Sequence, residues 1–234
     1  VKRRKKMSDH ATNKTWSYSR LSVFEQCPKR YYYASIEKIP TPQHPAAMRG
    51  TDIHNDAELY IKGEGKLTKP LEQFSEGFEQ LREGYIEGTV SVEEDWAFDL
   101  DWQPAGWKEK NTWCRYKIDA YIKKPDRTVV IDFKTGRYMG NEETHEQQCA
   151  LYAAATYRRD PSIENLQAEL WYLDHGKISR HSYTVEEIKG RQNVFHDRAL
   201  KLTEATEYPA KASVQNCKWC HFGKIGVCSE YRSI

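Results

Sequence analysis

The sequence predicts an α/β fold with a mixed central β-sheet flanked by helices. Apolar residues recur at helical spacing in four segments, at 46–62, 71–86, 143–159 and 184–205. Apolar and polar residues instead alternate, with many Val, Ile, Trp and Tyr residues, in five others, at 89–100, 112–123, 127–134, 166–173 and 178–183. This order of helices, antiparallel strands, helix, strands and helix is typical of a mixed sheet covered by helices.

The N-terminal residues predict three further segments. The basic run KRRKK at residues 2–6 indicates a solvated, disordered tail over residues 1–16. Residues 19–27 have the pattern of a short helix, which Pro28 interrupts. Three prolines within 36–45 indicate a loop before the first long helix.

Two of the predicted strand pairs are short hairpins. The turn-rich sequence KKPDR at 123–127 joins the second and third strands, so these two should pair as neighbours. His175-Gly176 lies between the last two strands. No Gly/Ser-rich or Pro-rich linker divides the chain, so we expect a single domain over residues 17–234, which ends in a cysteine-rich segment at 207–230.

Charge and hydropathy narrow the classes of function. The formal net charge is only +2, so no overall basic field directs the chain to nucleic acid. No apolar run is long enough to cross a membrane or to form the core of a signal peptide. We therefore expect a cytoplasmic location, or the host cytoplasm if a phage encodes the protein. The six cysteines would stay reduced there, where clustered thiols suit a metal better than disulfides.

Two acidic strand segments carry the chemistry. They are KIDAYI, with Asp119, and IDFKTG, with Asp132 and Lys134. Because the hairpin pairs these strands, the two carboxylates should lie close together, where they repel unless a cation such as Mg²⁺ or Mn²⁺ lies between them. A neighbouring lysine can position water and stabilise charge on a phosphate, which is the equipment for phosphodiester hydrolysis. Alone, the D-x-K pattern of Asp132 and Lys134 favours an ordinary surface ion pair.

The wider pattern resembles a known family. In order, the chain contains SYSRLSVFEQCPKRYYY, RGTDIH, KIDAYI, IDFKTG and QCALY, over residues 17–152. This series resembles the RecB-like branch of the PD-(D/E)XK nuclease superfamily, which includes CRISPR-associated and phage exonucleases. The resemblance implies a restriction-endonuclease-like core. One departure is CRYKID, which lacks the glycine often found two residues before the aspartate.

The resemblance also implies roles for individual residues. The implied metal ligands are His54, Asp119, Asp132 and the backbone carbonyl of Phe133. Lys134 would activate the attacking water, and Gln148 and Tyr152 would line the site. The family's upstream strand glutamate is Glu93 or Glu94, between which the sequence does not choose. Glu58, one helical turn after His54, is either a ligand of a second metal or part of a solvated helix face.

Four cysteines suggest a second metal centre. Cys27 lies near one end of the chain, and Cys217, Cys220 and Cys228 lie near the other. Iron–sulfur members of the family use one early and three late cysteines to join the termini at a [4Fe–4S] cluster. Spacing alone does not separate this cluster from Zn²⁺, for which His221 is a further candidate ligand. Cys114 and Cys149 fall in a strand and a helix and are expected to be core thiols.

The function expected from these motifs is a Mg²⁺- or Mn²⁺-dependent DNA nuclease. We expect an exonuclease that acts on single-stranded DNA or on free DNA ends, in repair, recombination or phage DNA processing. The alternative is a catalytically silent subunit that keeps the fold for DNA binding or scaffolding. The polarity of cleavage and the oligomeric state do not follow from the sequence.

Overall fold

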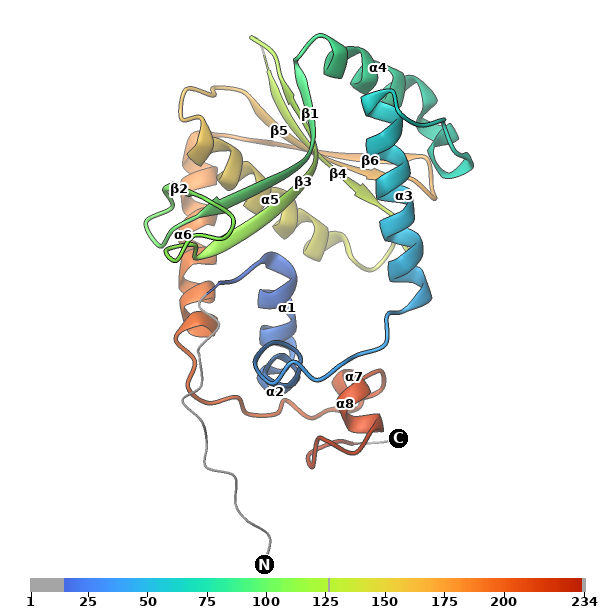
Figure 1. Ribbon diagram of the computed structural model, residues 1–234. Coiled ribbons are helices and arrows are strands. Elements are labelled where there is room, and N and C mark those ends of the chain that lie inside the picture. Colours follow the sequence, from blue (N-terminus) through green and yellow to red (C-terminus); the bar gives the residue numbers. More distant parts are fainter. Residues whose placement is uncertain (1–14, 126, 233–234) are drawn as a thin grey trace, which may run out of the picture. The chain divides into compact units, whose positions relative to one another are not determined.

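A computed structural model describes residues 15–125 and 127–232 (Figure 1). The described chain forms two compact units, one from 43–195 and one from 15–42 together with 196–232. The predicted tail falls almost entirely on residues 1–14, which lie outside the described residues; Trp16, at its end, is buried. The expectation of a single domain over 17–234 remains a prediction.

The larger unit is built on a six-stranded sheet in the order β2-β1-β3-β4-β5-β6. The strands are β1 (Val90–Phe98), β2 (Pro104–Ala105), β3 (Cys114–Lys123), β4 (Thr128–Lys134), β5 (Leu166–Tyr172) and β6 (Lys177–Tyr183). Only β4 and β5 pair in parallel. A parallel pair needs a crossover, which α5 (Glu142–Arg159) supplies. The mixed sheet predicted from the sequence is confirmed, whereas the two-residue β2 was not predicted.

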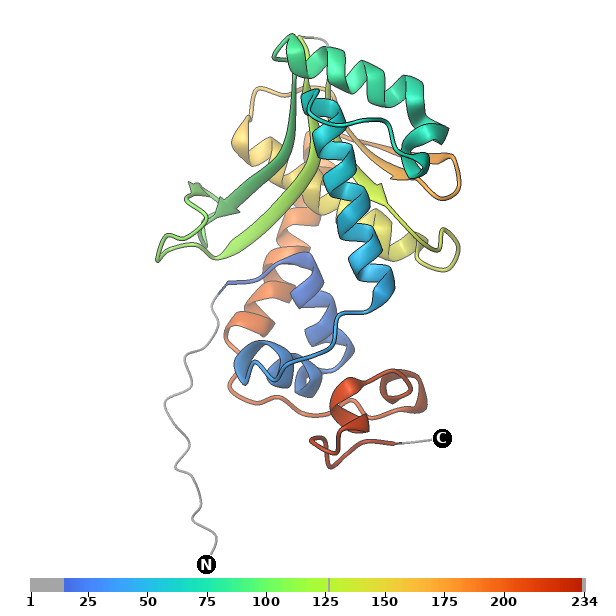
Figure 2. The ribbon, with the colours of Figure 1, turned by 45° about the vertical axis from the view of Figure 1, so that its right-hand side comes forward.

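The helices of this unit cover both faces of the sheet (Figures 1 and 2). On one face lie α3 (Pro45–Lys62), a 3₁₀ turn (Lys69–Phe74) and α4 (Ser75–Ile86), so the predicted second helix has a 3₁₀ start. Val129, Ile131 and Phe133 of β4 pack into their core. The alternate residues Asp132 and Lys134 instead contact α5 side chains on the other face. Because side chains alternate along a strand, the two carboxy-terminal polar residues of β4 share the face opposite this core, and both faces of the strand are buried.

The smaller unit brings the N- and C-terminal segments together. It contains α1 (Tyr18–Gln26), α2 (Pro28–Tyr31), a π-helical turn (Tyr32–Ile36), the end of α6 (Val185–Thr203), α7 (Val214–Cys217) and α8 (His221–Lys224). Arg198 binds both carboxylate oxygens of Glu25 at 2.7 Å. The Tyr33 hydroxyl donates to the carbonyl of Val227 at 3.1 Å. Pro28 interrupts the first helix as predicted, but it begins a second one, since proline is well suited to the first turn of a helix.

None of the helices in the described part of the chain combines the length and apolar character that a membrane crossing would require.

A tight contact between α4 and β5 provides a test of the packing. A Cβ atom at Gly77 would lie 2.7 Å from the Trp171 ring, which Phe74, Phe78 and Phe133 hold in place. We expect Gly77→Ala to lower the free energy of unfolding by about 1–3 kcal/mol, because the added methyl group would overlap the Trp171 ring unless the ring or the helix shifts. Urea denaturation measures this.

The matched control is Gly190→Ala in α6, where nothing lies within 4 Å of the added Cβ. That variant should be unchanged or more stable by about 0.5–1 kcal/mol, as for other exposed helical glycines. Equal effects at the two positions would contradict this account of the contact.

Candidate active site

Two buried carboxylates lie where the pairing of β3 and β4 ends. The pairing runs from Lys123↔Thr128 to Ala120↔Ile131, so Asp119 and Asp132 are the next residues on the two strands. Both are buried, with 8% and 5% of their surface exposed. The register of the hairpin therefore places the two residues close together, as the sequence predicted.

Asp119 uses its two oxygens differently. The backbone N–H of Phe133 donates to Oδ2 at 2.6 Å, and His54 Nδ1 lies 3.2 Å from Oδ1. Burial, and then the charge of Asp132, raises the pKa of Asp119 above its ordinary value. Burial alone would lower the pKa of His54, but the hydrogen bond and charge of Asp119 outweigh it and raise that pKa to about 9. The His54 imidazole is therefore expected to be protonated at neutral pH, which places a positive charge beside the Asp119 carboxylate.

Asp132 is held by side chains from α5 and by Lys134. The Tyr152 hydroxyl donates to Oδ1 at 2.9 Å, and Gln148 Nε2 lies 3.3 Å from the same oxygen. Burial, followed by the charge of Asp132, raises the pKa of Tyr152 well above its ordinary value, so the hydroxyl keeps the proton that it donates. Lys134 Nζ donates to Gln148 Oε1 at 2.7 Å and lies 2.5 Å from Asp132 Oδ2. Gln148 thus fixes both the lysine and the aspartate.

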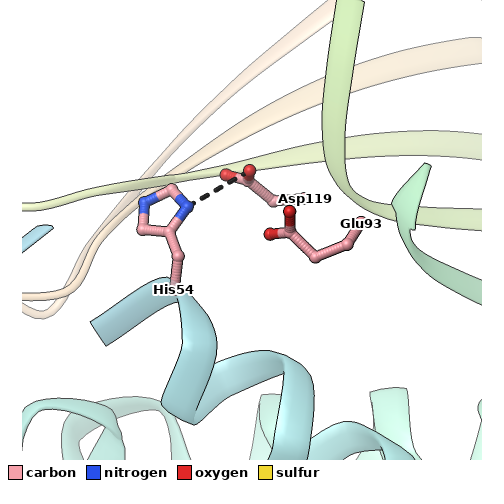
Figure 3. A group of neighbouring side chains, drawn as sticks. All are labelled: His54, Glu93 and Asp119. Carbon is pink, nitrogen blue, oxygen red and sulfur yellow. Dashed lines mark ion pairs between the residues drawn. The ribbon is translucent and has the colours of Figure 1, made fainter. Parts of the chain in front are cut away.

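Glu93 is the glutamate that joins this group (Figure 3). One ligand atom each from His54, Glu93 and Asp119 lie within 4.8 Å of one another. Glu93 has φ +51°, a left-handed conformation that is costly for a residue other than glycine. Its neighbour Glu94 lies instead near Trp96 Nε1, at 3.4 Å. The sequence left these two glutamates open, and proximity to His54 and Asp119 selects Glu93.

The chemistry of these donors fits a divalent cation. Burial, and then the charge of Asp119, raises the pKa of Glu93, although the Lys117 ammonium 3.2 Å away opposes this shift. Asp132 Oδ2 is buried and is paired with the Lys134 ammonium at 2.5 Å. Carboxylate oxygens of this kind are the ligands that Mg²⁺ and Mn²⁺ prefer. This group shares His54 and Asp119 with the ligand set expected from the sequence. It adds Glu93, and it does not include Asp132 or the Phe133 carbonyl.

A second set of contacts holds the chain after Lys134. Asp174 Oδ2 accepts the N–H of Gly136 at 2.6 Å, and His175 Nε2 lies 2.7 Å from the Gly136 carbonyl oxygen. Arg49, the first residue of the RGTDIH segment, binds both oxygens of Asp174 at 2.9 and 2.5 Å. Sequence analysis missed Arg49 and Asp174, although Arg49 stands in a motif from which only His54 was selected. Glu58, in contrast, is paired with Lys62 at 2.6 Å.

The four selected cysteines lie in the smaller unit, where they line one cavity: Cys27, Cys217, Cys220 and Cys228. All are free thiols. His221 is not among the residues that line this cavity, which include Tyr33 and Phe222. Cys114 and Cys149 are buried in β3 and α5 of the larger unit and do not line this cavity.

Comparison with known proteins identifies the family. The sequence profile of the PD-(D/E)XK nuclease superfamily matches residues 15–226, so the chain belongs to that superfamily. No curated protein matches the sequence.

Two solved structures share the fold. A protein from Eubacterium rectale named as a putative exonuclease is similar with a TM-score of 0.55 at 14% identity, covering 97% of this chain and 93% of its own. The crystal structure of SSO0001 is similar with a TM-score of 0.52 at 18% identity, covering 94% of this chain and 88% of its own. These likenesses support the α/β architecture with its mixed sheet.

Neutralising Glu93 tests its place in the site. We expect Glu93→Gln to weaken Mn²⁺ binding at least about tenfold, because it removes one negative ligand from the group around Asp119. Isothermal titration calorimetry measures the affinity. The matched control is Glu94→Gln, one residue along β1, which should bind Mn²⁺ as the unaltered protein does. If the two variants bound Mn²⁺ equally well, the assignment of Glu93 would be wrong.

Proposed function

We propose that this protein is a DNA nuclease that depends on Mg²⁺ or Mn²⁺. The observation that carries the proposal is the pair of buried carboxylates, Asp119 and Asp132, beside Lys134 in a member of a nuclease superfamily. The acidic group with His54 and Glu93 would hold the cation, with Asp132 completing the site. When bound, such a cation polarises a phosphoryl oxygen and lowers the pKa of coordinated water.

The protein's own residues would position the substrate and the attacking water. Lys134 is held by Gln148 and Asp132, so its ammonium has a fixed location from which it can orient water and offset charge on the phosphate. Tyr152 and Gln148 together keep Asp132 in one orientation. Preorganised charges of this kind cost no rearrangement during the reaction, which is why they lower its barrier.

An exonuclease of the RecB-like branch is the more specific form of the proposal. It is supported by the ordered series of motifs from residue 17 to residue 152 and by the likeness in fold to a protein named as a putative exonuclease. Its substrate would be single-stranded DNA or DNA with a free end, in repair, recombination or phage DNA processing. A catalytically silent scaffold is less consistent with a chain that keeps both carboxylates paired, Asp119 with His54 and Asp132 with Lys134, Gln148 and Tyr152.

Cleavage assays test the activity and its mode. Asp119→Asn, Asp132→Asn and Lys134→Met should each lower the rate of DNA cleavage by at least about 100-fold, since each removes a preorganised charge. EDTA should stop cleavage, and added Mg²⁺ or Mn²⁺ should restore it. End-labelled linear DNA should be degraded, whereas circular DNA should resist an exonuclease.

The control is Asp95→Asn, which changes an exposed aspartate on β1 and should leave the cleavage rate unaltered. Cleavage at the full rate by the Asp132 variant would refute the proposed site. Loss of circular DNA would contradict the exonuclease assignment and leave the nuclease proposal in place.

We further propose that Cys27, Cys217, Cys220 and Cys228 bind a [4Fe–4S] cluster, with Zn²⁺ as the alternative. Their lining of one cavity supports a common ligand. All four are free thiols and can act as ligands, and their spacing does not separate the two metals.

Metal analysis of anaerobically purified protein tests this centre. We expect a brown protein with broad visible absorption and bound iron, both lost in Cys27→Ser because one thiolate ligand is removed. The control is Cys149→Ala, which removes a thiol outside the cavity and should retain the iron. A colourless protein with stoichiometric zinc would select the alternative, and a protein with neither metal would contradict both.

A further inference from the structure

Trp219 is an exposed aromatic side chain on the chain between α7 and α8. Its side chain is 74% exposed, whereas the other tryptophans among the described residues are buried or half-buried. The backbone around it is ordered, because Lys218 N–H donates to the Val214 carbonyl at 2.9 Å and Cys220 N–H to that of Cys217 at 2.9 Å. Cys217 and Phe222 are buried on either side. The indole is therefore held outward by a fixed local structure.

Two lysines flank this ring. Lys218 Nζ lies 5.4 Å from the ring centroid and Lys224 Nζ lies 5.1 Å from it, both within cation–π range. Both lysines are exposed. Neither forms an ion pair with a carboxylate within residues 15–125 and 127–232. The surface formed by Lys218, Trp219 and Lys224 thus presents an apolar ring with two uncompensated positive charges.

We infer that this surface is a stacking platform for an unpaired base of single-stranded DNA. A base can stack on the exposed indole while the ammonium groups move to the adjacent phosphates, and aromatic rings with flanking positive charge are the usual means of binding single strands. A base paired within a duplex is stacked on its neighbours and does not offer its face to the ring. This inference rests on the proposed DNA substrate and adds a contact outside the catalytic group.

A protein partner is the main competing occupant, because Ile225 and Val227 nearby are also exposed, at 48% and 38%. Protein–protein interfaces are, however, depleted in lysine, and lysine supplies both charges next to Trp219. The charge of the surface matches a phosphate backbone. These two observations favour nucleic acid.

The test measures DNA affinity in a full-length Asp132→Asn background, so that the DNA stays intact. Fluorescence anisotropy compares a labelled oligothymidylate with an abasic oligomer of the same length, which has the phosphates but no bases. Trp219→Ala should weaken binding of the oligothymidylate roughly tenfold. It should leave binding of the abasic oligomer unaltered, and Trp219→Phe should restore most of the affinity. The double variant Lys218→Gln, Lys224→Gln should weaken the binding of both oligomers. It should also reduce the slope of log K against log salt concentration by about 1.4, since each of two lost phosphate contacts contributes about 0.7.

Control variants in the same background are Tyr85→Ala, which removes another exposed aromatic ring, and Lys66→Gln with Lys69→Gln, which removes two other exposed charges. Equal affinity of Trp219→Ala and its background for oligothymidylate would overturn the inference and assign the surface to a protein partner. A parallel loss for the abasic oligomer would also overturn it, because the effect would not depend on bases. Wild-type protein that binds DNA through Trp219 without cleaving it would refute the nuclease proposal and leave this inference standing.

Discussion

The burial of two carboxylates on neighbouring strands is the constraint on which the site depends. Asp119 and Asp132 are both almost fully buried, and burying like charges together costs free energy unless partners compensate for it. The partners come from three elements: His54 from α3, the Phe133 N–H from β4, and Gln148 and Tyr152 from α5. The helices on both faces of the sheet are therefore required to hold the pair, in addition to covering the core.

The backbone next to the two buried carboxylates is strained on one strand and held by side-chain contacts on the other. Glu93 adopts a left-handed conformation beside Asp119, where its carboxylate adds to the negative charge. Such strain persists only where the surrounding structure holds it, and the long β1–β3 pairing on both sides of Glu93 does so. On the other strand, Asp174 and Arg49 fix the turn at Gly136 immediately after Lys134. The site is thus rigid at both strands that supply its charges.

The sequence predicted what local patterns encode. Periodicity located the strands and long helices, and the short turn after β3 was sufficient to place Asp119 beside Asp132. It did not distinguish Glu93 from Glu94, because that choice depends on which of the two lies beside His54 and Asp119 in the folded chain. The Arg49–Asp174 pair joins residues 125 positions apart in the chain, and no local pattern signals it. The roles of the cysteines and of the metal ligands came from family resemblance and remain predictions.

The hydrogen bond from Phe133 to Asp119 also fixes the orientation of that carboxylate. Oδ2 accepts the backbone N–H at 2.6 Å, and Oδ1 faces His54 Nδ1 at 3.2 Å. Each carboxylate oxygen has two lone pairs, so both oxygens keep acceptor capacity for a cation. A main-chain hydrogen bond between the two strands therefore sets the direction in which Asp119 presents its remaining lone pairs.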